Sequence, residues 1–167
     1  VDGIIGAAYG SAGERCMAVS VAVAVGNIAD QLVDKISNNA QNLKVAPWTD
    51  ETSDMGPLIS NEHKEKVENY INIGEKEGAK LLLDGRNFKI QGYENGYFIG
   101  PTLFDHVKEN MQIYKEEIFG PVLSIVRVNN YDEALKLVND HEFGNGVSIF
   151  TREGDTGRTF SNKAKIG

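Results

Sequence analysis

The single cysteine of the chain, Cys16, lies just after a run of small residues and beside a cation. Gly10-Ser11-Ala12-Gly13 precede it, and Arg15 is its neighbour. Small side chains let the backbone approach whatever the sulfur touches, and a nearby positive charge favours the nucleophilic thiolate. The backbone N–H of Cys16 is also placed to receive an oxyanion formed by its attack. Cys16 is therefore either a covalent nucleophile or a small buried hydrophobe, because free cysteines are often buried.

A second segment, from Lys115 to Val122, places two carboxylates and an aromatic ring directly before an apolar run. A carboxylate can accept two hydrogen bonds from a ribose diol. The ring of Phe119 can pack on a planar heterocycle. Taken alone, the segment also fits an acidic loop that enters a sheet.

Other catalytic signatures are incomplete. Ser11 fails as the nucleophile of a Gly-x-Ser-x-Gly elbow, because Tyr9 occupies the first glycine position. No Gly-x-Gly-x-x-Gly fingerprint and no Gly-Lys-Ser/Thr phosphate loop occurs. The histidines have no partners at the spacing of metal ligands; they are His63, His106 and His141. We expect no metal site and no complete dinucleotide fingerprint.

Alternating strands and helices are predicted to position these residues. A β-branched run predicts a strand at 19–25, and short strand candidates follow at 81–83, 97–104, 122–128 and 147–150. Helices are predicted after Asn27, Ser60 and Asn130, each of which can cap a helix N-terminus, and Asn130 to Glu133 have the spacing of a capping box. This order predicts an α/β fold with a mostly parallel, twisted sheet, flanking helices and ligand sites at the carboxyl ends of the strands.

Composition narrows the classes of function. The 167 residues fit one domain, and the net charge of −7 argues against a nucleic acid partner. The longest apolar run, 19–25, is far shorter than the roughly 20 residues that cross a bilayer, so we expect no membrane span. A lone cysteine fits a reducing compartment, and we expect a cytoplasmic protein. The first residue is Val1 rather than Met, and both ends look cut from a longer chain.

Five segments resemble the aldehyde dehydrogenase superfamily in content and order, over nearly the whole chain. They are Gly13-Glu14-Arg15-Cys16, Met55-Gly56-Pro57-Leu58, Gly100-Pro101-Thr102-Leu103-Phe104, Glu116 to Val122, and Ile149-Phe150-Thr151. The segment from Gly6 to Ala18, with Glu14 where Gln is commoner, is most similar to the CoA-acylating, methylmalonate-semialdehyde branch of that superfamily.

The resemblance implies that residues 1–167 are the thiol-bearing catalytic domain, truncated at both ends and without the NAD-binding domain, of an NAD-dependent enzyme. Cys16 would attack an aldehyde, a hydride would pass to NAD, and a thioester would remain on the enzyme. Glu117, rather than Glu116, would hold the nicotinamide ribose, and Phe119 would lie near the nicotinamide. An Asn that completes the oxyanion hole in the family would lie before Val1.

The resemblance also implies two substrate-contacting residues. Phe150 matches an aromatic that lines the substrate funnel, although it equally fits a core residue at a strand end. Arg15 would pair with the carboxylate of a semialdehyde acid, because a guanidinium fork suits a carboxylate. The side chain of Arg15 can instead point into the protein.

The branch implies a semialdehyde substrate and coenzyme A as cosubstrate. Methylmalonate semialdehyde would give propionyl-CoA and malonate semialdehyde acetyl-CoA, with loss of the β-carboxylate as CO2 or bicarbonate. The parent protein would be a homo-oligomer, and we expect the isolated chain to be inactive. Two alternatives stay open: a hydrolytic aldehyde dehydrogenase, in which an upstream Glu activates water, and a noncatalytic structural or interaction domain.

Overall fold

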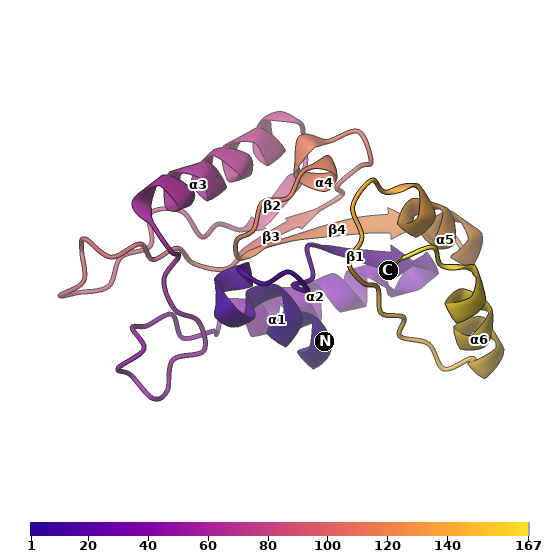
Figure 1. Ribbon diagram of the computed structural model, residues 1–167, viewed down its shortest axis with the longest axis horizontal. Helices are drawn as coiled ribbons and strands as arrows, with labels where there is room; N and C mark the ends of the chain where they lie inside the picture. The colour runs from indigo at the N-terminus through magenta and orange to yellow at the C-terminus, as the bar shows by residue number, and fades with distance from the viewer. Residues whose placement is uncertain (167) are drawn as a thin grey trace.

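The computed structural model describes residues 1–166 and contains a four-stranded sheet in that part of the chain (Figure 1). Its strands are β1 (Val21–Val25), β2 (Lys80–Leu83), β3 (Thr102–Asp105) and β4 (Val122–Val128), in the order β1-β4-β3-β2. The β1–β4 and β3–β4 pairs are parallel, and β2 runs antiparallel to β3. The predicted α/β fold with a mostly parallel sheet is confirmed.

Six helices accompany this sheet in residues 1–166. They are α1 (Asp2–Tyr9), α2 (Ala29–Ala40), α3 (Asn61–Lys76), α4 (Gln112–Lys115), α5 (Tyr131–Asp140) and α6 (Gly154–Lys163), with 3₁₀ turns η1 (Gly10–Gly13) and η2 (Gly26–Ile28). Figure 1 shows α3 and α4 above the strands and α1 and α2 below them. All of β3 and the first five residues of β4 are buried, so the core extends over both faces of the central strands.

Side-chain caps fix two of the helices as predicted. The hydroxyl of Ser60 accepts a hydrogen bond from the N–H of His63 at 3.1 Å. The amide oxygen of Asn130 accepts from the N–H of Glu133 at 3.0 Å, and its Nδ2 donates to the Glu133 carboxylate. The predicted Asn27 cap is wrong. Gly26, at φ +67°, turns the chain after β1, and Asn27 lies inside η2 rather than before α2.

Two predicted strands differ from the structure. The strand predicted at 97–104 begins only at Thr102 and ends at Asp105. The strand predicted at 147–150 is absent, since no described strand lies beside it to satisfy its backbone N–H and C=O groups. Val147, Ile149 and Phe150 are instead exposed.

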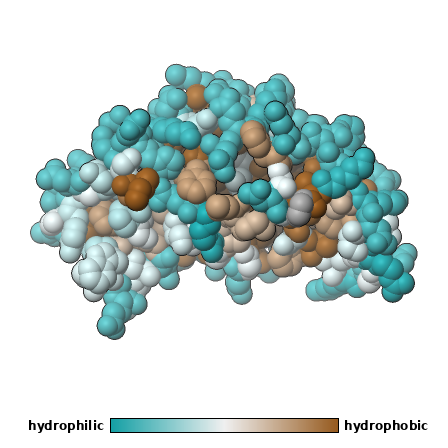
Figure 2. Space-filling model, in the orientation of Figure 1, coloured by the Kyte–Doolittle hydropathy of each residue, from teal (hydrophilic) through white to brown (hydrophobic). Residues whose placement is uncertain are grey.

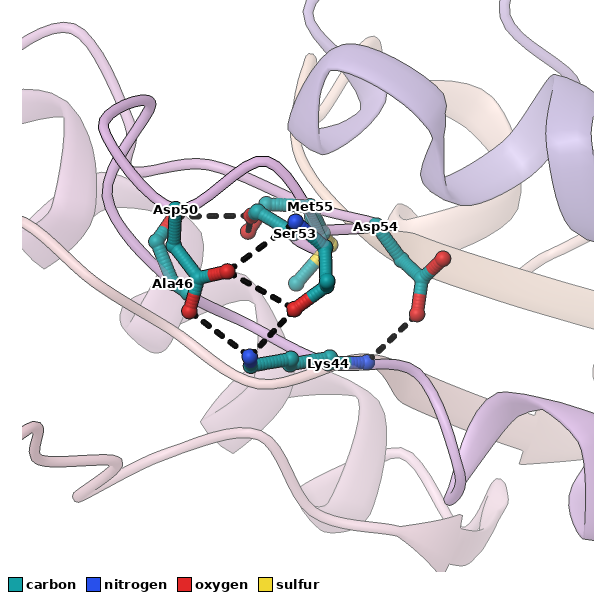
Figure 3. A network of polar contacts seen from close by, with 7 residues as sticks. Lys44, Ala46, Asp50, Ser53, Asp54 and Met55 are labelled. Atoms are coloured by element: carbon teal, nitrogen blue, oxygen red, sulfur yellow. Dashed lines mark hydrogen bonds and ion pairs between the residues drawn. The ribbon is translucent and has the colours of Figure 1, made fainter.

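The loop between α2 and α3 is ordered by polar contacts around Lys44 (Figure 3). The Lys44 ammonium lies 2.7 Å from a carboxylate oxygen of Asp50, and the Lys44 backbone N–H donates to Asp54 at 2.8 Å. The hydroxyl of Ser53 donates to the carbonyl oxygen of Ala46. The bond from Lys44, followed by bonds from the hydroxyl and N–H of Thr52, lowers the pKa of Asp50 to about 2. This ordered loop connects the end of α2 to the start of α3.

At the carboxyl end of β3, a buried carboxylate is paired with an arginine of β4. The side chain of Asp105 is 2% exposed and receives Nε of Arg127 at 3.0 Å and Nη2 at 2.7 Å. Burial raises the pKa of Asp105, but hydrogen bonds from Arg127 and from the backbone N–H of His106 outweigh it, and the pKa is lowered. The ionised pair therefore stabilises the fold at neutral pH, and this contribution is lost as the pH falls through the folded-state pKa.

We expect Arg127→Met to lower the free energy of unfolding by about 2 kcal/mol at neutral pH, because the Asp105 carboxylate is left buried without its main partner. In the variant burial raises the pKa of Asp105, so protonation favours the folded state. The difference in free energy of unfolding between variant and wild type should then narrow as the pH falls toward 3.8, the ordinary pKa of aspartate. Urea unfolding of both proteins at neutral pH and near pH 3.8 measures this difference.

Arg86→Met is the matched control. Its carboxylate partners, Asp84 and Glu75, are 41% and 43% exposed. Removal of such solvent-exposed pairs costs less than about 1 kcal/mol. An Arg127→Met variant no less stable than Arg86→Met would contradict the expected role of the buried pair.

Candidate active site

Cys16 and the segment 117–119 lie at the same edge of the sheet, because each leads into one of two neighbouring parallel strands. Cys16 precedes β1 and Phe119 precedes β4, and the register pairs Val21 with Ser124. Neighbouring parallel strands begin at the same edge. The candidate residues therefore meet at the amino-terminal edge of these strands, not at the carboxyl edge that the sequence suggested, because the loops before the strands carry the reactive groups.

The loop that carries Cys16 is held in an uncommon backbone shape. The buried hydroxyl of Tyr9, at the end of α1, donates to the carbonyl oxygen of Thr102 at 3.0 Å, and burial raises the pKa of Tyr9. Ser11 and Ala12 then both have φ +52°, and Gly13 has φ +70°. Left-handed backbone costs roughly 1–2 kcal/mol for a residue with a Cβ, so the surrounding contacts must hold this loop.

Cys16 itself is exposed. The alternative of a small buried hydrophobe is therefore wrong. Nδ2 of Asn145 donates to the carbonyl oxygen of Cys16 at 3.1 Å and ties the segment after α5 to the cysteine loop. The sulfur thus projects from a loop whose backbone is fixed at both ends.

The cysteine loop and the Phe119 turn are in backbone contact. A Cβ added to Gly13 would lie 2.5 Å from the carbonyl carbon of Gly120 and closer still to its oxygen. Gly120 in turn has no room for a side chain, because its Cβ would lie 2.7 Å from Cγ2 of Val67 in α3. Phe119 adopts φ +59°. The two predicted halves of the site are thus packed directly against each other.

The two adjacent glutamates have different surroundings. Glu116 accepts hydrogen bonds from the hydroxyl of Tyr70 at 2.6 Å and from Nε2 of Gln112 at 3.1 Å. The first bond raises the pKa of Tyr70 to about 12 and is the main cause of the lowered pKa of Glu116. Glu117 is exposed and has no hydrogen bond or ion pair within residues 1–166. Its carboxylate oxygens are free to accept from a ligand.

Arg15 is turned toward α1. Its Nη2 donates to the carbonyl oxygens of Gly6 at 2.7 Å and Ala7 at 3.2 Å. The positive guanidinium thereby stabilises the C-terminal end of α1, where the helix dipole is negative. Nε and Nη1 have no partner in the described part of the chain. The pairing of Arg15 with a substrate carboxylate stays a prediction, and these two nitrogens are the donors that it requires.

Phe150 lies on the surface near α1. Its side chain is 77% exposed, so the alternative prediction, a core residue at a strand end, is wrong. A Cβ added to Gly3 would be 3.4 Å from Cζ of the Phe150 ring, which places that ring over the first turn of α1. Contact with a substrate stays a prediction for this residue.

An apolar surface flanks the cysteine loop. Figure 2 shows a largely hydrophilic face with apolar side chains gathered across its middle. The large apolar side chains exposed on the cysteine loop and on the segment after α5 are Met17, Phe143, Val147, Ile149 and Phe150. These two segments meet at the cysteine loop, since Asn145 binds the carbonyl oxygen of Cys16 and a Cβ on Gly146 would touch the Met17 side chain.

Sequence reasoning missed three residues that connect the site. Asn145 lies between two glycines, a turn pattern that could have drawn attention to it. Glu14 accepts from the backbone N–H of Ile59 at 3.2 Å, and His63 contacts the carbonyl oxygen of Phe119 at 2.6 Å. No local pattern indicates these two contacts, because each joins segments far apart in the sequence.

Metal-ligand clusters and membrane-spanning helices are both absent from residues 1–166. No group of three or more histidine, cysteine or acidic side chains is arranged there to hold a metal ion. No helix in the same range is both long enough and apolar enough to cross a membrane.

A family model and curated relatives match all or nearly all of the chain. The family model described as "Aldehyde dehydrogenase family" matches residues 1–167. The malonate-semialdehyde dehydrogenase of Pseudomonas aeruginosa is 51% identical, over 100% of this chain and 34% of that protein. The mitochondrial methylmalonate-semialdehyde/malonate-semialdehyde dehydrogenase [acylating] of Bos taurus is 49% identical, over 98% of this chain and 30% of that protein.

Solved structures share the fold. A Sinorhizobium meliloti 1021 protein assigned as a methylmalonate-semialdehyde dehydrogenase and complexed with NAD matches with a TM-score of 0.98 and 55% identity, over 99% of this chain and 34% of that one. The chain thus spans about a third of the length of these relatives. Because the family model covers every residue, the chain belongs to the aldehyde dehydrogenase family.

Proposed function

We propose that this chain is the thiol-bearing part of an NAD-dependent, CoA-acylating dehydrogenase of malonate or methylmalonate semialdehyde. One observation carries the proposal: the exposed thiol of Cys16 shares a sheet edge with the unpartnered carboxylate of Glu117 and with Phe119. The printed names of the relatives support the semialdehyde substrate, and the word "acylating" in the bovine name supports coenzyme A as acceptor.

The residues of the chain fit a nicotinamide cofactor. Glu117 has two free carboxylate oxygens, as the cis-diol of a ribose requires, whereas Glu116 is engaged by Tyr70. Phe119 supplies a half-buried ring in the same turn. We assign Glu117 to the ribose hydroxyls and Phe119 to the side of the nicotinamide ring.

The chemistry begins at Cys16. Its thiolate forms a C–S bond with the aldehyde carbon, and the carbonyl π electrons move to the oxygen, where the backbone N–H of Cys16 can stabilise the charge. NAD, when bound, would supply the acceptor for a hydride from this carbon, which would be oxidised by two electrons as the C=O bond forms again. An acyl thioester then remains on Cys16.

Release of the acyl group regenerates the thiol. The β-carboxylate, held until then by Arg15, leaves as CO2, or as bicarbonate when a water molecule adds to it. The electron pair of the broken C–C bond stays on the α-carbon, which takes up a proton. The thiolate of coenzyme A attacks the thioester carbonyl, the bond to Cys16 breaks, and acetyl-CoA or propionyl-CoA departs.

The test uses the full-length protein that carries this chain. It is given malonate or methylmalonate semialdehyde with NAD, with and without coenzyme A, and NADH and the acyl product are followed together. We expect NADH and acyl-CoA in equal amounts. Free acid as the sole product would place the protein with the hydrolytic enzymes, and no NADH from any aldehyde would favour the noncatalytic alternative.

We expect Glu117→Gln to raise the KM for NAD roughly tenfold, because a neutral amide loses charge-assisted hydrogen bonds to the ribose. Glu116→Gln is the matched control and should change this KM little, since its amide oxygen still accepts from Tyr70. Steady-state kinetics of the full-length protein measures both values. Equal effects of the two substitutions would contradict the assignment of the ribose to Glu117.

A further inference from the structure

A chain of contacts through Glu14 and His63 links the cysteine loop to the Phe119 turn. The Glu14 carboxylate accepts from the backbone N–H of Ile59 at 3.2 Å and lies 3.5 Å from Nε2 of His63. The same Nε2 is 2.6 Å from the carbonyl oxygen of Phe119. Because a carbonyl oxygen can only accept, Nε2 of His63 carries a hydrogen and donates a hydrogen bond to the Phe119 carbonyl.

These contacts are shielded and held at both ends. The side chains of His63 and Glu14 are 15% and 16% exposed, so water competes little for their hydrogen bonds. The backbone N–H of His63 is bound by the Ser60 cap, which fixes the start of α3. The imidazole also meets the Phe119 ring edge to face, with centroids 6.3 Å apart. The imidazole of His63 therefore contacts both the backbone carbonyl and the ring of Phe119.

The Phe119 turn needs such a restraint. Its φ of +59° is unfavourable for a residue with a Cβ and persists only where the surroundings enforce it. Gly13 and Val67 close two sides of the neighbouring Gly120. The hydrogen bond from His63 fixes the direction of the Phe119 carbonyl, which points toward the imidazole that also contacts Glu14.

We propose that Glu14 and His63 are positioning residues that set the Phe119 turn relative to the cysteine loop. Glu14 orients the imidazole, and the imidazole holds the Phe119 carbonyl. Neither side chain needs to touch the substrate. The inference rests on the proposed function, in which a hydride leaves a carbon bound to Cys16 for a ring beside Phe119, a transfer that depends strongly on distance and alignment.

The test compares His63→Ala, His63→Gln, Glu14→Ala and Glu14→Gln in the full-length protein. We expect His63→Ala to lower kcat/KM for NAD roughly ten- to a hundredfold, since small misplacements are costly for a transfer of this kind. His63→Gln keeps an N–H donor and should restore most of the rate. Glu14→Ala should show a smaller loss of the same kind, and Glu14→Gln should not, because it keeps an acceptor for Ile59.

A second measurement does not depend on turnover. Hydrogen–deuterium exchange without cofactor should speed up in a peptide spanning 117–122 in His63→Ala and Glu14→Ala, and stay slow in both conservative variants. Alkylation of Cys16 by iodoacetamide should keep its wild-type rate in all four. His106→Ala, which removes an exposed imidazole beyond the other end of β3, is the control and should match the wild type in every assay.

The outcomes separate this inference from the proposed function. A wild-type protein that forms no NADH would overturn the proposed function, while the exchange data would still decide whether His63 orders the turn. An active wild type with an unaffected His63→Ala would overturn the inference. So would a loss in His63→Gln as large as that in His63→Ala, or a silent Glu14→Ala beside an impaired His63→Ala, since His63 would then act without Glu14.

Discussion

Cys16→Ser in the full-length protein is expected to lower NADH formation by roughly a thousandfold or more, because removal of a covalent nucleophile eliminates the step on which the others depend. A serine hydroxyl occupies nearly the same space but yields far less anion near neutral pH. Since the side chain is exposed, the free energy of unfolding should change by less than about 0.5 kcal/mol.

The measurement pairs initial rates of NADH formation with urea unfolding of the same variant. Iodoacetamide-treated wild type serves as a chemical control, with peptide mass spectrometry to confirm that the alkylated residue is Cys16, the only cysteine of residues 1–167. A Cys16→Ser protein that keeps more than a tenth of the wild-type rate would remove Cys16 from the role of nucleophile, whatever the family to which the chain belongs.

Gly13→Ala is expected to have the largest effect on stability. At φ +70°, alanine costs roughly 1–2 kcal/mol. The added Cβ also meets the backbone of Gly120 at 2.5 Å or less, a group that cannot rotate aside as a side chain can. Overpacking of this kind costs about 1–3 kcal/mol more, so we expect a total loss of roughly 3 kcal/mol.

Gly78→Ala is the matched control for this substitution. Gly78 has φ +90°, and a Cβ there meets no atom within 4 Å, so alanine reports the conformational cost without the contact. Urea unfolding of both variants isolates the contact by difference. Because the contact joins the cysteine loop to the Phe119 turn, Gly13→Ala should also reduce NADH formation in the full-length protein, whereas Gly78→Ala should not. Equal stability losses would contradict the close packing.

The strands and caps that could be predicted are those whose signals are local. The run at 122–128 is rich in valine and isoleucine, and β4 has the predicted bounds. Ser60 and Asn130 cap the helices expected of them. The run at 147–150 has the same kind of composition but no described neighbour with which to pair. Composition alone does not reveal whether a partner strand is present.

The helices α1 and α6 were not predicted, for a related reason. The sequence of α1 contains Gly3 and Gly6, and that of α6 contains Gly154 and Gly157, residues that weaken an isolated helix. Packing stabilises α1, which buries Ala8 and Tyr9, whereas α6 buries only Phe160. Local propensity therefore gave no signal for either.

The candidate site was predictable as a set of residue types but not as an arrangement. Cys16, Glu117 and Phe119 could be chosen because a thiol, a carboxylate and an aromatic ring have known uses. The contacts that join them run through Glu14, His63 and the glycine at position 13, and each bridges distant parts of the chain. One sequence carries no record of such pairings.

The pairing of β1 with β4 also has a consequence for the order of folding. It joins the first strand of the sheet to the last, and Val21 meets Ser124 only after the intervening chain has been closed into a loop. The entropy of that closure slows contacts of such long range relative to local ones. The helical turns and the β2–β3 pair involve shorter loops and are free to form earlier. A nascent chain would therefore carry its reactive sulfur for some time before the Phe119 turn arrives beside it.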